Sequence, residues 1–320
     1  MPTTHTVTGA TGFVGRHLTR QLLERGHTVR AFVRDRAKAT AVLGCHDQLE
    51  LIVGDCLEEN DCLAATEASH ACIHLVGILR EHGSATYERI HTHATRNMLA
   101  ACQSSGTTRY IQMSALGASP LSEAAYLTTK FDAERAVRNS NLDWTILRPG
   151  LIHGPDGDFT QMAAKWARGT APPHFFMPYF TRVETDESGR HAVIPQVQPV
   201  FVEEVARAAC DALDCDDSIG EIIPLAGAQT LDFADMLRTI RDHIPDLGPH
   251  LAPVGIPGHL AATKARAFEF LGVGGLLPFN SSMAIMAQQD CTADLTRARA
   301  MLDFNPAAFA DSLACYAAAL

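Results

Sequence analysis

Positive charge is in short supply in this 320-residue chain: 26 Lys and Arg residues stand against 36 Asp and Glu residues, for a formal net charge of −10. Proteins that bind nucleic acid neutralise its phosphates with clustered basic side chains, so no nucleic-acid partner is expected. Gly and Pro, at 23 and 16 residues, are not in excess, which excludes collagen-like and low-complexity chains. At 47% hydrophobic residues, the composition is that of a globular protein with room for one large α/β unit or two domains.

Signatures of metal and disulfide sites are also missing. None of the nine Cys residues is spaced as CxxC, so we expect no metal centre and a reducing, cytoplasmic setting. The longest uncharged run, residues 270–289, is interrupted by Gly and Pro residues, so we expect no transmembrane segment. Residues 1–5 are too few and too polar for a signal peptide, which also favours the cytoplasm.

The first half of the chain alternates short apolar runs with amphipathic stretches. The runs, predicted to be strands, are Thr4–Thr8, Thr28–Val33, Leu49–Val53, Ala71–Val76, Tyr110–Met113 and Trp144–Leu147. The amphipathic stretches, predicted to be helices, include Val14–Arg25, Tyr87–Gln103 and Ala124–Arg138. This alternation predicts right-handed crossovers and a parallel sheet. We therefore predict an α/β, Rossmann-type doubly wound domain over residues 1–155.

The pattern loosens beyond residue 155. Residues 155–198 predict an excursion over the mouth of a cleft, where the aromatic residues of 174–180 either line an apolar substrate pocket or pack between domains. His153, just before it, is either a substrate contact or a solvated loop residue. Further elements are predicted at Gln198–Phe201, Val202–Leu213, Glu221–Leu225, Thr230–Ile244 (capped by Thr230 or Asp232) and in a helical tail, Pro306–Leu320. The apolar residues 270–286 are predicted to belong to the core of the second domain. We predict a smaller, mixed substrate domain at 156–320, with parts of 198–228 completing the first domain.

A glycine-rich turn between the first strand and the first helix is the most specific feature. It reads Thr8-Gly9-Ala10-Thr11-Gly12-Phe13-Val14-Gly15, the spacing and context of a dinucleotide-binding turn. Gly9 suits the tight turn, Gly12 the close approach of a pyrophosphate, and Gly15 the packing of helix on strand. The helix N-terminus offers free N–H groups to the phosphates, so Thr11, Phe13 and Val14 are also candidate cofactor contacts.

The end of the second strand bears on the choice between NADP(H) and NAD(H). A carboxylate there binds the ribose hydroxyls of NAD, whereas this chain has Val33 followed by Arg34, Asp35 and Arg36. A guanidinium suits the 2′-phosphate of NADP, with Arg16 as a second contact, so NADP(H) is favoured. The alternative is that Asp35 binds the ribose and the cofactor is NAD(H).

Three later strand ends carry further candidate cofactor contacts. Asp55, after the third strand, is placed to meet the adenine amino group, and Val76-Gly77, after the fourth, lets backbone approach the nicotinamide ribose. Pro149, within Arg148-Pro149-Gly150, ends the sixth strand. Because the carboxyl ends of parallel strands meet at one edge of the sheet, these positions belong to a single site.

Tyr126 and Lys130 are the candidate catalytic pair. Four residues apart on a predicted helix, they share one face. An ammonium beside a phenol lowers the phenol pKa, which suits Tyr126 to proton transfer, and Lys130 can also bind the nicotinamide ribose. Ser114, just after the fifth strand, is a candidate hydrogen-bond donor to substrate.

Together, Thr8-Gly9-x-x-Gly12-x-x-Gly15, Tyr126-x-x-x-Lys130 and Arg148-Pro149-Gly150 resemble the short-chain dehydrogenase/reductase superfamily, in its extended or atypical branch. Ser114-Ala115-Leu116-Gly117-Ala118 and the segments 142–149 and 200–206 are similar to the atypical group related to the 39 kDa accessory subunit of respiratory complex I. The resemblance implies a catalytic tetrad of Asn, Ser, Tyr and Lys. Here His91 stands where Asn is expected, and the serine position falls nearer Ala115 than Ser114.

Three functions follow from these residues. The first is an NADP(H)-dependent oxidoreductase or isomerase acting on a carbonyl or alcohol, with a small-molecule substrate. The second, which the altered tetrad and the resemblance favour, is a non-catalytic nucleotide-binding accessory or regulatory protein with peripheral membrane or protein-complex association. The third is a protein of quinone or isoprenoid chemistry, favoured by the apolar second half.

Overall fold

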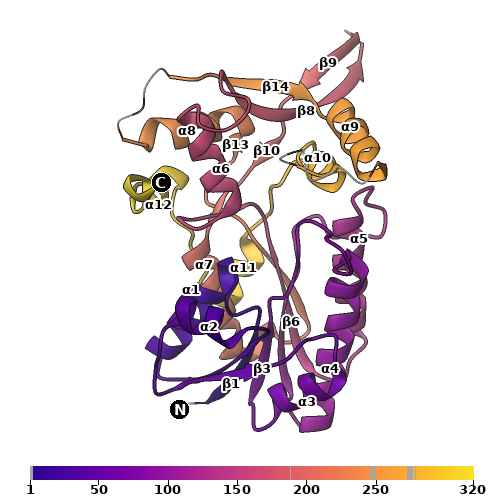
Figure 1. Cartoon of the computed structure of the whole chain (residues 1–320), viewed down its shortest axis with the longest axis vertical. Coiled ribbons are helices and arrows are strands. Elements are labelled where there is room, and N and C mark those ends of the chain that lie inside the picture. The colour runs from indigo at the N-terminus through magenta and orange to yellow at the C-terminus, as the bar shows by residue number, and fades with distance from the viewer. Residues whose placement is uncertain (1–2, 188, 246, 248–249, 272–276, 278) are drawn as a thin grey trace.

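The computed structural model describes residues 3–187, 189–245, 247, 250–271, 277 and 279–320. The lower half of the molecule in Figure 1 holds the N-terminus and the large sheet with its helices, and the upper half holds smaller sheets with their own helices and the C-terminus. Part of the predicted apolar segment 270–286, residues 272–276 and 278, lies outside the described residues.

The large sheet has seven strands in the order β12-β6-β5-β4-β1-β2-β3, and every neighbouring pair is parallel. In chain order these strands are β1 (Thr4–Thr8), β2 (Thr28–Val33), β3 (Leu49–Val53), β4 (Ala71–His74), β5 (Arg109–Met113), β6 (Asp143–Pro149) and β12 (Glu221–Leu225). The order reverses between β1 and β4. In such sheets ligands bind at the carboxyl edge beside that reversal.

Helices cover both faces of this sheet. One face carries α1 (Phe13–Glu24), α2 (Arg36–Leu43), α7 (Val202–Leu213) and α11 (Thr296–Leu302). The other carries α3 (Glu59–Thr66), α4 (Ala94–Ser105) and α5 (Ala125–Arg138). Leu18 and Leu22 of α1 pack into the first core, and Tyr110 of β5 and Met98 of α4 into the second. The predicted α/β doubly wound fold is confirmed.

The six predicted strands and three predicted helices of the first half are present, with ends shifted by a few residues. The predicted helix Tyr87–Gln103 begins with a π-helical turn, Glu88–His93, ahead of α4. Three elements from beyond residue 198 join the first half. One of them, α11, lies outside the segment 198–228 that was predicted to complete this domain, and it packs against α7 and β12. β12 pairs with β6, and α7 packs along α1.

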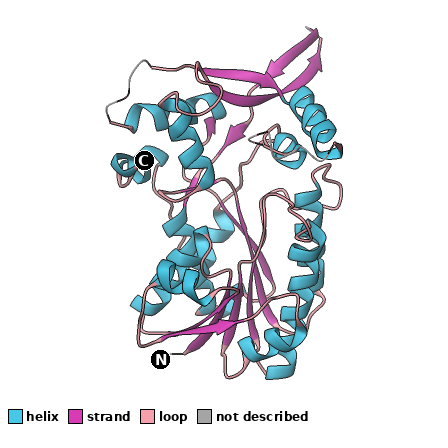
Figure 2. Ribbon diagram, in the orientation of Figure 1, coloured by secondary structure: helices cyan, strands magenta, loops and turns pink. Residues whose placement is uncertain are grey.

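The upper half contains three small sheets (Figure 2). They pair β7 (Ile152–His153) with β11 (Val200–Phe201), β10 (Gln196–Val197) with β13 (Leu231–Asp232), and β8 (Met177–Asp186) with β9 (Gly189–Val193) and β14 (Pro253–Pro257). Its helices are α6 (Asp158–Ala167), α8 (Phe233–His243), α9 (Gly258–Phe270), α10 (Ser281–Met286) and α12 (Phe309–Ala314). The predicted smaller, mixed second half is confirmed.

Several local expectations need correction. The segment 155–198, predicted as an excursion, contains the helix α6 and the β8–β9 hairpin. The predicted helical tail is shortened to α12 and a 3-10 turn, Ala317–Ala319. Asp232, rather than Thr230, caps α8, accepting a hydrogen bond from the Asp235 N–H at 2.6 Å. Among the described helices, none is both long enough and apolar enough to span a bilayer.

Candidate functional site

The glycine-rich turn is closed by contacts that leave no room for larger side chains. Gly9 has φ +71°, a conformation that favours glycine, and its carbonyl accepts the Gly12 N–H at 2.9 Å. A Cβ on Gly15 would overlap the Gly9 carbonyl oxygen and lie 2.8 Å from the Ala10 Cα. The sequence-predicted role of Gly15 in close helix–strand packing therefore has a direct steric basis.

The start of α1 is open to an anionic ligand. Gly12 is the N-cap, and no side chain among the described residues caps this helix. The first N–H groups of a helix carry a partial positive charge and favour phosphate. Thr11, Phe13 and Val14 lie at this opening, half-buried. The turn thus fits the pyrophosphate of a dinucleotide, because its backbone is accessible and its donors are not taken by a side-chain cap.

Phe13 and Arg16 connect this turn to the loop after β7. A Cβ on Gly154 would lie 3.1 Å from the Phe13 ring, and one on Gly157 would lie 2.9 Å from it. Arg16 forms an ion pair with Asp156, with Nη1 3.1 Å from Oδ2. Arg16, predicted as a second contact to the 2′-phosphate, is thus held at Asp156 in this structure.

The three polar residues after β2 have different surroundings. Asp35 caps α2 by accepting the Lys38 N–H at 3.0 Å, and Arg36 donates to the Leu51 carbonyl at 2.9 Å. Arg34 is exposed and forms no hydrogen bond or ion pair with any residue that the structure describes. Arg34 is therefore the member of this group whose guanidinium is available to a ligand.

The later strand ends lie at the same carboxyl edge. Asp55 follows β3, and its Oδ1 accepts the Leu57 N–H at 3.0 Å. Val76 is half-buried after β4. Pro149 is buried at the end of β6, and its carbonyl accepts the Leu116 N–H at 2.8 Å. A Cβ on Gly77 would lie only 3.0 Å from the Lys130 Nζ, so glycine allows the ammonium to approach this backbone closely.

Tyr126 and Lys130 both project from α5 toward this edge. Lys130 is 4% exposed, and its Nζ donates to the Met113 carbonyl at 3.1 Å. Burial lowers the pKa of Lys130 to about 8, against the opposing effect of Glu134. The Tyr126 ring stands edge-on to the rings of His91 and Tyr87, at centroid distances of 5.2 and 5.9 Å.

The expected lowering of the phenol pKa by the ammonium is wrong for this arrangement. Burial, with the neighbouring Tyr87 second, raises the pKa of Tyr126 to about 12. Desolvation therefore outweighs any help from Lys130, because the charged phenolate is the form that loses solvation. Tyr126 is a protonated phenol at neutral pH.

Ser114 faces a buried ion pair instead of Tyr126. Its hydroxyl donates to Glu134 Oε1 at 2.5 Å, and Arg148 binds both oxygens of the same carboxylate at 2.8 and 2.6 Å. Glu134 is fully buried. The structure thus brings Ser114 together with Glu134 and Arg148, while Ala115 packs in the apolar cluster that includes Tyr126.

His91, at the position where the resemblance implies Asn, is tied on both ring nitrogens. Nε2 accepts the Ile78 N–H at 3.1 Å, so the ring proton is on Nδ1, which donates to Thr129 Oγ1 at 2.9 Å. Burial, with the charge of Lys130 second, lowers its pKa to about 2. His91 is therefore a neutral side chain that links the loop after β4 to α5.

Other predicted candidates lie elsewhere. His153 is buried and bonds to Tyr316 Oη at 2.8 Å and Ser312 Oγ at 3.3 Å, so it anchors the carboxy-terminal helix and is neither solvated nor a cleft residue. The aromatic residues of 174–180 do not form one cluster: Phe175 is 84% exposed, Tyr179 stacks on Phe233, and Phe180 packs on Phe279.

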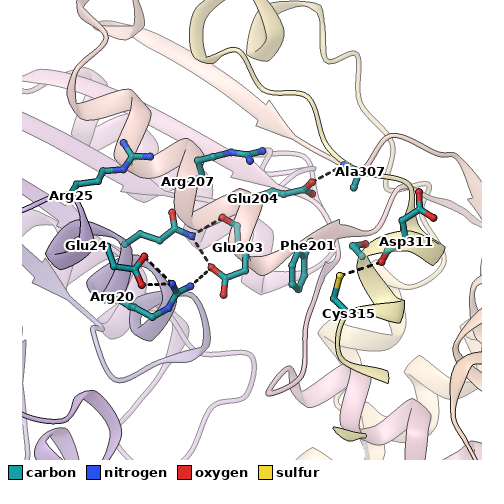
Figure 3. Close-up of a pocket in the computed structure, with 12 residues that line it drawn as sticks. Arg20, Glu24, Arg25, Phe201, Glu203, Glu204, Arg207, Ala307, Asp311 and Cys315 are labelled. Atoms are coloured by element: carbon teal, nitrogen blue, oxygen red, sulfur yellow. Dashed lines mark hydrogen bonds and ion pairs between the residues drawn. The ribbon is translucent and has the colours of Figure 1, made fainter. Parts of the chain in front are cut away.

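A pocket with a cavity volume of about 590 Å³ opens between α1, α7 and α12 (Figure 3). Its wall carries an Arg20–Glu24–Glu203 ion-pair network and Phe201. None of the glycine-turn residues and neither member of the Tyr126–Lys130 pair lines it. This pocket is thus separate from the candidate site.

Two residues at the site were missed by the sequence reasoning. Glu134 lies one turn beyond Lys130, and extending the Tyr126-x-x-x-Lys130 spacing by four residues would have found it. Thr129, the partner of His91, carries no sequence signal, because its contact depends on how the π-helical turn packs against α5.

The doubly wound sheet and the residues at its carboxyl edge define a class of protein. It is the class of dinucleotide-binding α/β proteins that have a Rossmann-type sheet and a Tyr–Lys pair. A family model described as NAD(P)H-binding matches residues 9–169, half of the chain. The chain belongs to this NAD(P)H-binding family. Its relatives and the solved structures of similar fold agree with the resemblance to the atypical branch of the short-chain dehydrogenase/reductase superfamily. The predicted resemblance and the predicted binding of a nicotinamide dinucleotide are confirmed at this level.

Curated relatives share part of their length with this chain. A mitochondrial NADH dehydrogenase [ubiquinone] 1 alpha subcomplex subunit 9 from Arabidopsis thaliana is 28% identical over 271 residues, 83% of this chain and 63% of the relative. A ceramide reductase from Caulobacter vibrioides is 29% identical over 163 residues, 50% of each chain. The chain thus spans between half and two thirds of these relatives.

A solved structure of an NADPH-dependent quinone oxidoreductase from Escherichia coli has a TM-score of 0.69 at 17% identity, covering 97% of this chain and 98% of that one. At this identity the likeness concerns the fold. Both halves of the chain therefore have a counterpart in a known architecture.

Proposed function

We propose that this protein is a cytoplasmic NADP(H)-dependent reductase of a carbonyl group, with a small-molecule substrate. The observation that supports the proposal is the approach of Lys130 to the Gly77 backbone, in the loop that follows β4 and adjoins Gly9 of the glycine-rich turn, with Tyr126 one turn away on α5. The relation to known oxidoreductases supports it.

Arg34 supports NADP(H) over NAD(H). It is exposed and forms no hydrogen bond or ion pair with the described residues, whereas the carboxylate of Asp35 already caps α2. A free guanidinium at this strand end suits a 2′-phosphate through charge-assisted bonds. The glycine turn would hold the pyrophosphate at the N–H groups of Thr11–Val14, and Asp55, Val76 and Pro149 would line the remaining length of the dinucleotide.

The bound dinucleotide supplies the hydride. Tyr126 supplies the proton: its hydroxyl is protonated at neutral pH and donates to the carbonyl oxygen as negative charge develops there. A phenol held in this form favours reduction, because oxidation of an alcohol would require the phenolate. Lys130 holds its charge next to the Gly77 backbone, where it can bind the ribose hydroxyls.

Ser114 is proposed to position this pair. It acts through Glu134, which lies one turn from Lys130 and is anchored by Arg148. Tyr126 belongs to an apolar cluster that includes Ala115, Leu127 and Phe279, so we propose an apolar carbonyl compound as substrate. The relation to a ceramide reductase and the fold of a quinone oxidoreductase agree with such a substrate.

A second candidate is a nucleotide-binding accessory protein with little turnover, associated with a protein complex or a membrane periphery. Two observations favour it. His91 replaces Asn and uses both ring nitrogens in structural bonds, and a relative matched over 83% of the chain is a subunit of NADH dehydrogenase.

One experiment separates the two. Purified protein is incubated with NADPH and a panel of aldehydes, ketones and quinones, and the nicotinamide absorbance is followed for the wild type and Tyr126→Phe. Turnover that falls at least 100-fold in the variant, with NADPH affinity retained, supports the reductase. Tight NADPH binding without turnover on the whole panel supports the accessory protein.

A further inference from the structure

Three buried polar atoms belong to side chains of two neighbouring strands behind the candidate site. They are His74 Nε2, Tyr110 Oη and Gln112 Oε1, on side chains at most 1% exposed, and none finds a hydrogen-bond partner among the described residues. Buried polar groups are nearly always satisfied, and an exception calls for an explanation. Three exceptions in adjacent strands point to a shared cause.

The sheet register gathers these atoms. His74 is paired with Gln112, and Cys72 with Tyr110, across β4 and β5, so all three side chains project from one face. The His74 ring stacks on Tyr110, with centroids 6.3 Å apart, and is fixed by its Nδ1, which lies 2.7 Å from Thr8 Oγ1. The unsatisfied Nε2 therefore points away from Thr8.

Lys130 adjoins the same place. Its Nζ donates to the Met113 carbonyl, and the Gln112 amide nitrogen approaches that oxygen at 3.4 Å. An ammonium has three N–H donors. Among the described residues, the Met113 carbonyl is the one acceptor bonded to the Lys130 ammonium. His74 also lies close enough for its pKa to be lowered by Lys130, after the larger effect of burial.

We propose that ordered water lies between β4, β5 and α5, bonded to His74 Nε2, Gln112 Oε1 and Lys130 Nζ, with Tyr110 Oη at its edge. Water suits this set because it accepts from the ammonium and donates to the amide oxygen, with the two to four partners that a buried water needs. A cation would be repelled by Lys130, and an anion would face the acceptor oxygen of Gln112. The water holds Lys130 in place from behind, independently of any substrate.

A crystal structure of the wild-type protein at about 1.5 Å tests this directly. We expect a density peak within hydrogen-bond distance of His74 Nε2, Gln112 Oε1 and Lys130 Nζ, lost in Gln112→Met. A dry contact in which the Gln112 amide is reversed and bonds to His74 itself would overturn the proposal.

Stability gives a second, independent readout. The side chain of Met is about as long as that of Gln but lacks the amide group. Gln112→Met therefore removes hydrogen bonds to the water, if the water is present. We then expect Tm to fall by about 2–4 °C. If Gln112 Oε1 is truly without a partner, the same change raises Tm, which would refute the proposal.

Thr19→Val is the matched control. Thr19 Oγ1 on α1 is also buried without a partner, but it stands apart from Lys130 and the β4–β5 group. If this hydroxyl has no partner, its replacement by an isosteric apolar side chain should leave Tm unchanged or raise it. A fall in Tm equal to that of Gln112→Met would mean that the readout reports packing, and it would count against the proposal.

Discussion

Ser114 and Glu134 are joined by a 2.5 Å hydrogen bond beneath the candidate site, from Oγ to Oε1. Because Arg148 binds the same carboxylate, the ends of β5 and β6 are tied to α5, the helix that carries Tyr126 and Lys130. A serine close in sequence to the expected catalytic position thus serves to hold the helix that bears the reactive pair.

Ser114→Ala should therefore cost stability more than chemistry. Removing the hydroxyl takes one donor from a fully buried carboxylate, and we expect a loss of about 1–2 kcal/mol in the free energy of unfolding, measured by denaturant titration. Turnover should fall far less than in Tyr126→Phe. A loss of turnover as large as that of Tyr126→Phe, with unchanged stability, would show that Ser114 contacts the substrate.

Arg34→Ala should weaken NADPH binding selectively. Charge-assisted bonds to a phosphate are worth about 1.5–3 kcal/mol, so we expect a 10- to 100-fold rise in the Kd of NADPH by calorimetry and no change for NADH. Arg36→Ala is the control, because that guanidinium is bonded to the Leu51 carbonyl. Equal losses for NADPH and NADH in Arg34→Ala would contradict the preference.

Gly77→Ala should disturb the site while leaving the fold intact. The new Cβ would lie 3.0 Å from Lys130 Nζ, the flexible end of a side chain, so the ammonium moves and the backbone does not. We expect Tm within a few degrees of the wild type and a clear fall in NADPH affinity and turnover. In Gly15→Ala the new Cβ clashes with backbone atoms, so we expect a lower yield of folded protein from that variant. Wild-type binding by Gly77→Ala would argue against a ribose site here.

The rate of reduction should fall as the pH rises above about 8. Tyr126, with a pKa of about 12, remains protonated over this range, whereas Lys130, with a pKa of about 8, loses its charge. The pH profile of kcat/KM should be level from pH 6 to 7 and decline on the alkaline side. In Lys130→Met the remaining activity should be low and independent of pH. An alkaline limb that survives in Lys130→Met would assign it to another group.

Lys130→Met should stabilise the protein at pH 7. Because the pKa of Lys130 is depressed from 10.5 to about 8, the folded state carries a cost at pH values below 8. It corresponds to about 3 kcal/mol, offset by about 1 kcal/mol for the lost bond to Met113. The stability gain over wild type should shrink between pH 8 and 10.5, where the unfolded chain alone still binds the proton. Urea titrations at pH 7 and 9.5 measure it, and a less stable variant at pH 7 would refute it.

The sequence alone determined the fold class, the glycine turn and the Tyr126–Lys130 spacing. These depend on local signals: apolar periodicity marks strands and helices, glycines at positions 9, 12 and 15 mark a turn between them, and a four-residue interval places two side chains on one helical face. The family comparison confirms the nicotinamide dinucleotide that this turn predicts.

Tertiary structure decided what those side chains do. Burial, which raises the pKa of Tyr126 and lowers that of Lys130, is set by contacts between α5, the π-helical turn and the second half of the chain. The partners of Ser114, Arg16 and His153 lie 20 or more residues away, at Glu134, Asp156 and Tyr316. Spacing along a chain specifies which side chains share a face, but desolvation and pairing depend on the segments that fold against that face.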